Sequence, residues 1–197
     1  MEKGIKTNTN SIMKIIPQSI PEILLFQPEI IKEERGFFVE TMRRSFLSEA
    51  NLPNLIQHNQ SRSKFGVHRG LHYQLEQPQG KLVRCSYGKV FDVAVDIRKS
   101  SPTFGKSVTK ILDDLNHEQL WIPKGFAHGF MVLSEFADFC YLCSDYYNPK
   151  SQHGIAWDDP YLNISWPKSI PKSKIILSSR DKNNSKINQK DSKDLFP

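Results

Sequence analysis

VFDVAVDI, residues 90 to 97, decides how this sequence folds, because apolar side chains alternate there with small or acidic ones. Side chains along an extended chain point in turn to its two faces, so a period of two is typical of a β-strand. We expect a half-buried antiparallel strand. Its apolar face would carry Phe91, Val93, Val95 and Ile97, and its polar face would carry Asp92, Ala94 and Asp96.

Short runs rich in Val, Ile, Phe and Tyr continue on both sides of this strand, from Leu55 to Leu142, with turn-rich breaks at 98–106 and 116–118. Many short strands separated in this way favour two packed sheets or a closed barrel. We therefore expect an all-β protein, a cupin-like jelly roll (a double-sheet antiparallel β-barrel) with a few short helices. Residues 41–50 are the best helix candidate, and the prolines within 20–31 suit edge strands.

The chain has 197 residues, which suits one domain with a sizeable core. We place that domain at 1–182 and expect residues 1–15 to form a loose N-terminal arm. Residues 183–197 are poor in apolar side chains and rich in Asn, Lys and Ser, so we expect a disordered polar tail.

The formal net charge of +6 is concentrated near the C-terminus, where eight Lys or Arg and three Asp follow from Lys168 onward. The rest of the chain is nearly neutral and has no basic stripe interleaved with aromatic residues, which argues against nucleic-acid binding. No apolar run is long enough to cross a membrane.

Three cysteines, an odd number, do not make a disulfide framework, and nothing like a signal peptide precedes them. A reducing cytoplasm fits best. Cys140 and Cys143 resemble half of a zinc site, but they lie in a strand-like run where residues three apart point to opposite faces. We interpret them as packing residues.

Four stretches of the sequence carry side chains that could do chemistry. In 68–74, His68, His72 and Gln74 would share one face unless Gly70 introduces a bulge. Lys81 begins an apolar face and either reaches out to solvent or points into a cavity. Tyr141 and His128 could equally be structural residues with satisfied hydrogen bonds.

Several blocks of the sequence resemble one known family. They are Glu34-Arg35-Gly36-Phe37-Phe38, Arg69-Gly70-Leu71-His72-Tyr73-Gln74, Gln79-Gly80-Lys81-Leu82, Ser101-Pro102-Thr103-Phe104-Gly105, IPKGFAHGF at 122–130 and Gly154-Ile155-Ala156-Trp157-Asp158-Asp159-Pro160. Together they resemble the nucleotide-sugar 3,5-epimerases that act on dTDP-4-dehydro-6-deoxyglucose, over about 34–181. The resemblance implies a cupin fold and a homodimer.

The resemblance also implies roles for particular residues. His72 would be the base, Tyr141 the acid, and Asp181 the carboxylate that orients the base, with Asp159 in reserve. The substrate-binding residues would be Arg35, Phe38, Glu40, Gln57, Asn59, Arg69, Lys81 and His128. No redox cofactor or metal is required, because a C4 ketone already acidifies the protons at C3 and C5. Histidine, with an ordinary pKa of about 6.5, is a natural base at cellular pH.

The sequence departs from the family pattern at four positions. Gln152 stands where a glutamate that contacts the nucleotide is common, which leaves the base preference open, and His58, Gln60 and His68 also differ from the commonest residues.

Three alternatives to double epimerisation remain. They are epimerisation at a single centre, a metal-dependent cupin enzyme that uses His68, His72 and His128, and a catalytically silent sugar-nucleotide-binding module. The His-x-His pair typical of metal cupins is absent, which disfavours the second.

Overall fold

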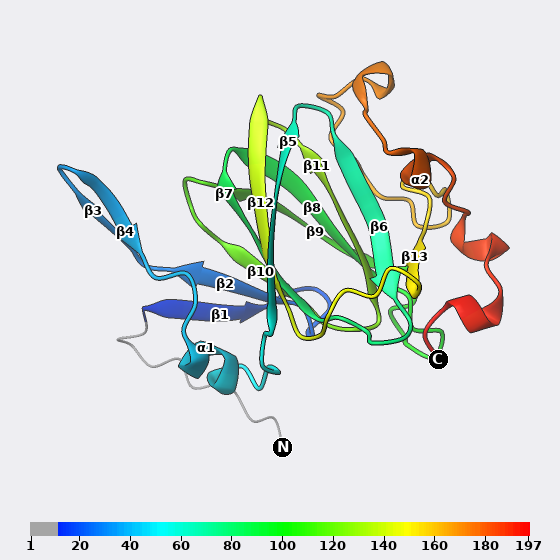
Figure 1. The fold of residues 1–197 in the computed structure, drawn as a ribbon, viewed down its shortest axis with the longest axis horizontal. Helices are drawn as coiled ribbons and strands as arrows, with labels where there is room; N and C mark the ends of the chain where they lie inside the picture. Colours follow the sequence, from blue (N-terminus) through cyan, green and yellow to red (C-terminus); the bar gives the residue numbers. More distant parts are fainter. Residues whose placement is uncertain (1–11) are drawn as a thin grey trace.

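A computed structural model of the chain describes residues 12–197, and two antiparallel sheets dominate it (Figure 1). Their strands are β1 Met13–Pro17, β2 Leu24–Pro28, β5 Gln57–Lys64, β6 His68–Gln74, β7 Lys81–Tyr87, β8 Lys89–Asp96, β9 Ser107–Asp113, β10 Gln119–Ile122, β11 Phe126–Val132, β12 Phe136–Cys143 and β13 Gln152–Gly154. One sheet runs β1-β2-β10-β7-β12-β5 and the other β13-β6-β11-β8-β9. The expected all-β, cupin-like architecture is confirmed. Residues 1–11 of the expected N-terminal arm lie outside the described residues.

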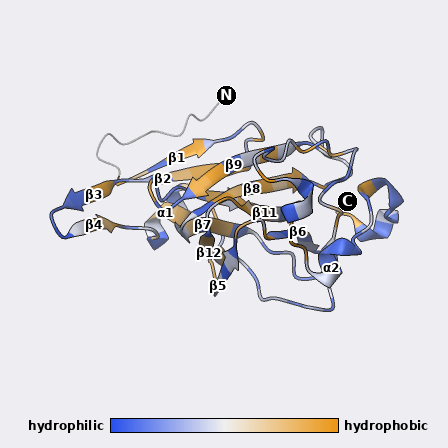
Figure 2. Cartoon of the chain, turned by 90° about the horizontal axis from the view of Figure 1, so that it is seen from above, coloured by the Kyte–Doolittle hydropathy of each residue, from blue (hydrophilic) through white to orange (hydrophobic). Residues whose placement is uncertain are grey.

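Many strand residues are hydrophobic (Figure 2). Their side chains form a central cluster between the two sheets and further clusters on both outer faces. Val83, Leu120 and Phe139 of one sheet meet Ala94 and Phe130 of the other in the central cluster. The α1 helix, Arg44–Glu49, covers the outer face of the six-stranded sheet through Phe46. It lies within the 41–50 segment that the sequence indicates.

The strand at 90–97 is buried on both faces, so the expectation of a half-buried strand is wrong. Val93 and Val95 face the outer cluster under the C-terminal segment, whereas Val90 and Ala94 face the central cluster. Asp92 and Asp96 are also fully buried. The alternation was correct, but the face that carries carboxylates points into the molecule rather than toward water.

A register shift at Gly70 changes which way the side chains of β6 point. His128 of β11 pairs with His72, yet Phe130 pairs with Arg69, so β6 holds one extra residue there. A Cβ on Gly70 would lie 2.5 Å from the Cα of Gly129, and its φ of +119° suits glycine alone. This β-bulge at Gly70 is the one that the sequence analysis considered as a possibility.

The shift turns His68 away from the face that carries His72. Val67 packs against the central cluster, whereas the ring of His68 contacts Trp157 and Trp166 beside the outer cluster. The interpretation that His68 and His72 share one strand face is therefore wrong.

A separate hairpin, β3 Ile30–Glu33 with β4 Gly36–Val39, extends away from the two sheets (Figure 1). Phe37 is 53% exposed and Phe38 62% exposed. Apolar side chains on an extended arm of this kind are poorly covered by their own chain.

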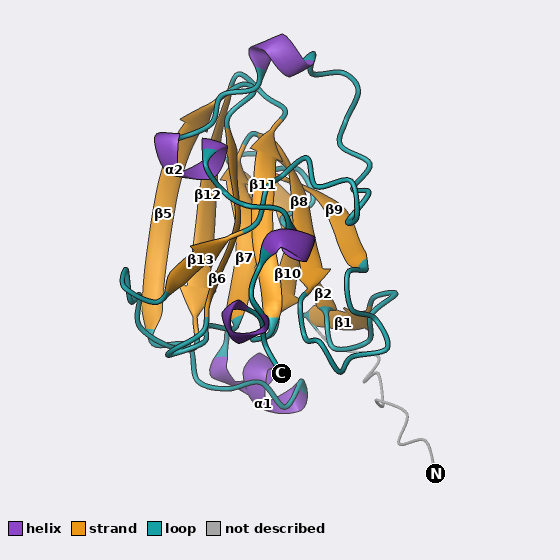
Figure 3. Ribbon diagram, turned by 90° about the vertical axis from the view of Figure 1, so that its right-hand side faces the viewer, coloured by secondary structure: helices purple, strands orange, loops and turns teal. Residues whose placement is uncertain are grey.

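The C-terminal segment lies along the outer face of the five-stranded sheet (Figure 3). It contains the short α2 helix, Ser179–Lys182, and the 3-10 turns Lys172–Lys174, Ile187–Gln189 and Ser192–Asp194. Ile187 and Leu195 are buried in the outer cluster, and the Tyr73 hydroxyl donates to the Asp194 carbonyl over 2.5 Å. The expected disorder of 183–197 is wrong, because these few apolar residues are spaced to reach the sheet.

Candidate active site

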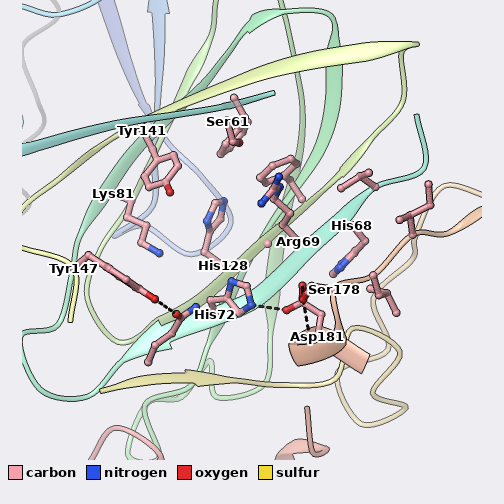
Figure 4. Close-up of a pocket in the computed structure, with 17 residues that line it drawn as sticks. Ser61, His68, Arg69, His72, Lys81, His128, Tyr141, Tyr147, Ser178 and Asp181 are labelled. Atoms are coloured by element: carbon pink, nitrogen blue, oxygen red, sulfur yellow. Dashed lines mark hydrogen bonds and ion pairs between the residues drawn. The ribbon is translucent and has the colours of Figure 1, made fainter. Parts of the chain in front are cut away.

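A cavity of about 480 Å³ opens between the two sheets (Figure 4). Strand β6 supplies Arg69 and His72, and β11 supplies His128. Lys81 of β7 and Tyr141 of β12 reach it from the opposite sheet. Asp181 comes from α2, so the cavity gathers six of the eleven residues that the sequence predicts for the site.

His72 and Asp181 form the shortest polar contact of the cavity. The His72 Nε2 lies 2.5 Å from the Asp181 Oδ1, although 109 positions separate the two residues in the chain. The His72 side chain is 26% exposed and that of Asp181 only 4%. The imidazole therefore reaches the cavity while the carboxylate stays behind it.

Local sequence fixes the position of Asp181. Ser178 precedes α2 as its N-cap, and its hydroxyl accepts the Asp181 backbone N–H over 3.1 Å. The same hydroxyl donates to the Asp181 Oδ2 over 2.7 Å. Such a reciprocal cap holds a carboxylate at the third helical position in one orientation.

The electrostatics of the pair determine its protonation. Burial acts to raise the pKa of Asp181, but the hydrogen bond and charge of His72, with the Ser178 hydroxyl, outweigh it and the pKa lies below its ordinary value. An ionised Asp181 only accepts hydrogen bonds, so the His72 Nε2 carries the proton. The Nδ1 lone pair of His72 is then free to take a proton from a ligand.

Lys81 and Tyr141 form the facing wall, and their polar ends point into the cavity (Figure 4). Burial lowers the pKa of Lys81, an effect that Cys143 and Asp92 partly offset. Burial also raises the pKa of Tyr141, so its hydroxyl keeps its proton more firmly than an exposed phenol does. The cavity thus sets a base on one sheet against a cation and a weak acid on the other.

His128 and Arg69 are held by partners of their own. The His128 Nε2 lies 2.8 Å from the Oδ2 of Asp92, which is fully buried in β8. The Arg69 Nε donates to the Ser63 Oγ over 3.0 Å, which leaves its terminal nitrogens to a ligand.

A smaller cavity of about 210 Å³ adjoins the first and contains Gln57 and Asn59. The Gln57 Nε2 donates to the Asn59 Oδ1 over 3.0 Å. The Gln57 Oε1 also accepts the backbone N–H of Tyr147 over 2.8 Å. The two cavities share His72, Lys81, Tyr141, Tyr147 and Gln152 along their walls.

Three of the predicted site residues, Arg35, Phe38 and Glu40, lie far from this region in the single chain. Arg35 forms an exposed ion pair with Glu33 on the β3–β4 hairpin. Glu40 pairs with Arg43 just after the hairpin. Neither they nor Phe38 line the larger or the smaller cavity.

Asp159 does not take the role held in reserve for it. It is buried elsewhere, where its carboxylate accepts the backbone N–H groups of Tyr161 and Ile187. It therefore anchors the C-terminal segment.

Sequence reasoning missed several residues around the site. The sequence pattern could have indicated Ser178, and it assigned Asp92 to the wrong face. Ser178 stands three residues before Asp181, the spacing of a capping box. Asp92 was assigned to a solvent face although it lies on the inward face of β8. Tyr147 and Arg180, whose side chains both donate to the Gln152 Oε1 at the rim, left no signal before the fold was known.

The histidines of a hypothetical metal site do not converge. His72 is paired with Asp181 and His128 with Asp92, while the ring of His68 lies between two tryptophans. Within residues 12–197, no group of three or more His, Cys, Asp or Glu side chains is arranged to hold a metal ion. No helix in the same range is long and apolar enough to span a membrane.

Comparison with known families identifies the chain. The family model for dTDP-4-dehydrorhamnose 3,5-epimerase matches residues 17–189. The chain belongs to this family. Among members of the epimerase family, the dTDP-4-dehydrorhamnose 3,5-epimerase of Shigella flexneri is 50% identical over 178 residues, which are 89% of this chain and 96% of that one.

Solved structures of epimerases share the fold. The dTDP-6-deoxy-D-glucose-3,5-epimerase of Legionella pneumophila, in complex with dTDP-4-keto-L-rhamnose, matches with a TM-score of 0.90 at 48% identity, over 93% of this chain and 97% of that one. ChmJ, a 3'-monoepimerase from Streptomyces bikiniensis in complex with dTDP-quinovose, matches with a TM-score of 0.81 at 33% identity, over 88% and 87%. The epimerase fold thus occurs in enzymes named for one or for two centres.

Proposed function

We propose that this chain inverts C3 and C5 of dTDP-4-dehydro-6-deoxy-glucose, giving dTDP-4-dehydrorhamnose, with His72 as base and Tyr141 as acid. The observation that carries this proposal is the placement of the two side chains on opposite walls of one cavity. Inversion needs a proton to leave one face of the sugar and another to arrive on the opposite face. Family membership and the ligand of the Legionella pneumophila structure support the choice of substrate.

Proton removal begins at the Nδ1 of His72, because Nε2 is engaged by Asp181. Taking the proton makes the ring cationic, and the adjacent carboxylate stabilises that charge. The electron pair of the broken C–H bond moves into the ring carbon–carbon bond, and the negative charge collects on the C4 oxygen. Lys81, the cation of the facing wall, stabilises the charge that develops on that oxygen.

Tyr141 then donates its phenolic proton to the carbon from the other face, and the electron pair on the C4 oxygen re-forms the ketone. Before the second centre reacts, His72 releases its proton to solvent and the tyrosinate regains one from solvent. Since the pKa of Tyr141 is raised by burial, the phenol stays protonated at cellular pH and is available as an acid.

The remaining predicted residues would hold the nucleotide diphosphate. The terminal nitrogens of Arg69 suit a phosphate, for which a planar guanidinium is well matched. His128 would contribute a further donor, and Gln57 and Asn59 would act in the adjoining cavity. Gln152 holds Tyr147 at the rim by a 2.6 Å hydrogen bond, which gives it a role in the site without a carboxylate.

We also propose that the chain works as a homodimer in which the β3–β4 hairpin reaches the partner's cavity. This arrangement would bring Arg35, Phe38 and Glu40 to a substrate, and it would cover the exposed Phe37 and Phe38. Burial of these rings would favour association by the hydrophobic effect. The three free cysteines, all buried, suit the cytoplasmic location that we propose.

Solvent-proton exchange tests the reaction. The dTDP-4-keto-6-deoxy sugar is incubated with the protein in D₂O, and H3 and H5 are followed by NMR. We expect deuterium at both positions of the product. Exchange at one position alone would assign the chain to single-centre epimerases such as ChmJ. No exchange at either position would contradict the proposal and leave a silent binding module.

Chelation tests the proposal that no metal takes part. Base, cation and acid are all side chains, so the rate should be unchanged after exhaustive dialysis against EDTA. Activity that is lost on dialysis and returns only with added Fe, Mn or Zn would contradict a mechanism carried by side chains alone.

A further inference from the structure

His68 is a buried histidine that the proposed acid–base mechanism does not use. It is 1% exposed and is among the largest fully buried side chains of the described residues. Its ring centroid lies 5.6 Å from that of Trp157 and 4.7 Å from that of Trp166. The Trp166 indole N–H is already engaged by the Trp157 carbonyl, so it does not serve the imidazole as a donor.

Neither ring nitrogen of His68 has a hydrogen-bond partner among residues 12–197, and neither reaches solvent. A buried polar group without a partner costs about 1–3 kcal/mol, and a leucine would fill the same space without that cost. An imidazole at this position is therefore unfavourable for packing alone, which points to a role in the neighbouring site.

That site is the His72–Asp181 pair. His68 lines the same cavity wall as Ser178 and Asp181, and its ring is turned toward them (Figure 4). The titratable groups that act on it are Asp181 of α2 and His72 of β6, while the two tryptophans packed against it carry no charge. The bulge at Gly70 turns His68 to the outer side of β6, toward the segment that carries Asp181.

The two histidines near one carboxylate are not equivalent. Burial lowers the pKa of His68 to about 3, more than the opposing effect of Asp181 restores, and His72 lowers it further. His68 is therefore neutral at cellular pH, whereas the partly exposed His72 is free to take up a proton.

We propose that His68 is a positioning residue that acts through Asp181: without a direct hydrogen bond, its neutral ring directs an N–H dipole toward the carboxylate. Such a dipole partly offsets the negative charge of Asp181 and weakens its pull on the proton of His72. His72 then loses its proton at a lower pH than it would without His68. The inference rests on the proposed role of His72 as the base.

Substitution by leucine and by glutamine tests this proposal. His68→Leu keeps the volume and removes the donor, so the acid limb of the kcat/KM profile should move up by about one pH unit. Above that limb, kcat/KM should stay within about threefold of the native value. His68→Gln restores an N–H donor and should return the limb toward its native position. An unmoved limb in His68→Leu, or an equal displacement in both variants, would overturn the proposal.

Ring ¹⁵N NMR of the free enzyme gives a second measurement that does not depend on turnover or on the variants folding. In the native protein the His68 ring should show the shifts of one neutral tautomer from pH 5 to pH 9; titration of this ring in that range would overturn the proposal. In His68→Leu the titration of His72 should move upward. If it moves while the kcat/KM limb does not, His68 acts as proposed and the assignment of His72 as base fails.

Melting temperature supplies the control for folding. At pH 7 His68→Leu should melt at or above the native temperature, because it removes two unpaired buried nitrogens. The folded pKa of about 3 lies below the ordinary 6.5, so the native protein should lose stability relative to His68→Leu as the pH falls from 6.5 toward 3. Parallel stability curves over that range would mean that the ring is not held neutral, contrary to the proposal.

Discussion

At the scale of single residues, the exposure of each side chain in the cavity determines which proton it can move. Asp181 is buried and ionised, and the partly exposed imidazole of His72 contacts it and lines the cavity. Tyr141 keeps its proton because burial disfavours the phenolate. Side chains from different sheets and from a short helix thus acquire distinct roles through their surroundings.

Tyr141→Phe should separate proton exchange from inversion. The intact His72 can still form the enolate, but the nearest acid is then the protonated His72 itself, which returns a proton to the same face. In D₂O the variant should label its substrate while product formation falls by about 10²–10⁴-fold. NMR of substrate and product measures both rates.

His72→Asn is the matched control for that experiment, because it should abolish both labelling and product. If Tyr141→Phe formed product at the native rate, or if His72→Asn still introduced deuterium, the assignment of acid and base would be wrong.

At the scale of elements, the β3–β4 hairpin and the loop after β8 each have a distinct role outside the two main sheets. The β3–β4 hairpin carries two predicted ligand-binding residues, Arg35 and Phe38, away from the cavity of its own chain, and the proposed homodimer would bring them to the partner's cavity. The loop after β8 is organised by one carboxylate: Asp96 accepts hydrogen bonds from Arg98, Ser101 and Thr103, and it is fully buried.

Mixing two inactive variants tests whether the hairpin serves a partner. Arg35→Ala and His72→Asn should each be nearly inactive alone. After mixing and subunit exchange, half of the dimers contain one chain of each kind, and each of these holds one intact site. Activity should recover to about one quarter of the native value, as expected for closed twofold interfaces. A mixture as inactive as its parents would show that Arg35 does not act across an interface.

Asp96→Asn should destabilise the loop in a pH-dependent way. Burial acts to raise the pKa of Asp96, but the hydrogen bonds of Arg98, Ser101 and Thr103 outweigh it and bring the pKa to about 2. Removing the charge of this buried pair should cost about 3 kcal/mol at neutral pH.

Because the folded pKa of Asp96 is depressed, its contribution is complete above the ordinary value of about 3.9 and is lost as the pH falls toward 2. The stability difference between native protein and variant should therefore shrink between about pH 4 and pH 2, as urea unfolding can measure. Asp191→Asn, at a side chain 72% exposed, should show neither effect. A difference that stays constant with pH would contradict the role of the Asp96 charge.

At the scale of the whole molecule, the C-terminal segment is part of the fold and of the site. It covers the outer face of the five-stranded sheet and brings Asp181 to His72 (Figure 3). The segment carries most of the net charge of +6, and its few buried apolar residues include Ile187 and Leu195.

Ile187→Ala tests whether the tail stabilises the domain. The side chain is 3% exposed in the outer cluster, and its truncation should lower the free energy of unfolding by about 2–4 kcal/mol. Asn188→Ala, at the neighbouring exposed position, should change it by less than about 0.5 kcal/mol. Equal melting temperatures for Ile187→Ala and the native protein would show that the segment contributes nothing to the fold.

Sequence alone predicted the fold class, because period-two alternation such as that of 90–97 depends only on local geometry. It also predicted six residues of the main cavity, through motifs around His72, Lys81 and His128. It could not predict which face of β8 is inward, since buried carboxylates such as Asp92 resemble solvent-facing ones. The direction of His68 depends on one extra residue in β6, and the docking of Ile187 depends on a surface formed by distant strands.

The long separation of His72 and Asp181 in the chain has a consequence for protein synthesis. Every strand of both sheets leaves the ribosome before the carboxylate that completes the pair. A chain that stops short of residue 181 lacks that carboxylate, and it also lacks Ile187 and Leu195 in the cluster that contains Val93 and Val95. Exposed apolar surface is what chaperones and proteases act upon. The same segment thus supplies both the carboxylate partner of His72 and part of the cover of an apolar surface.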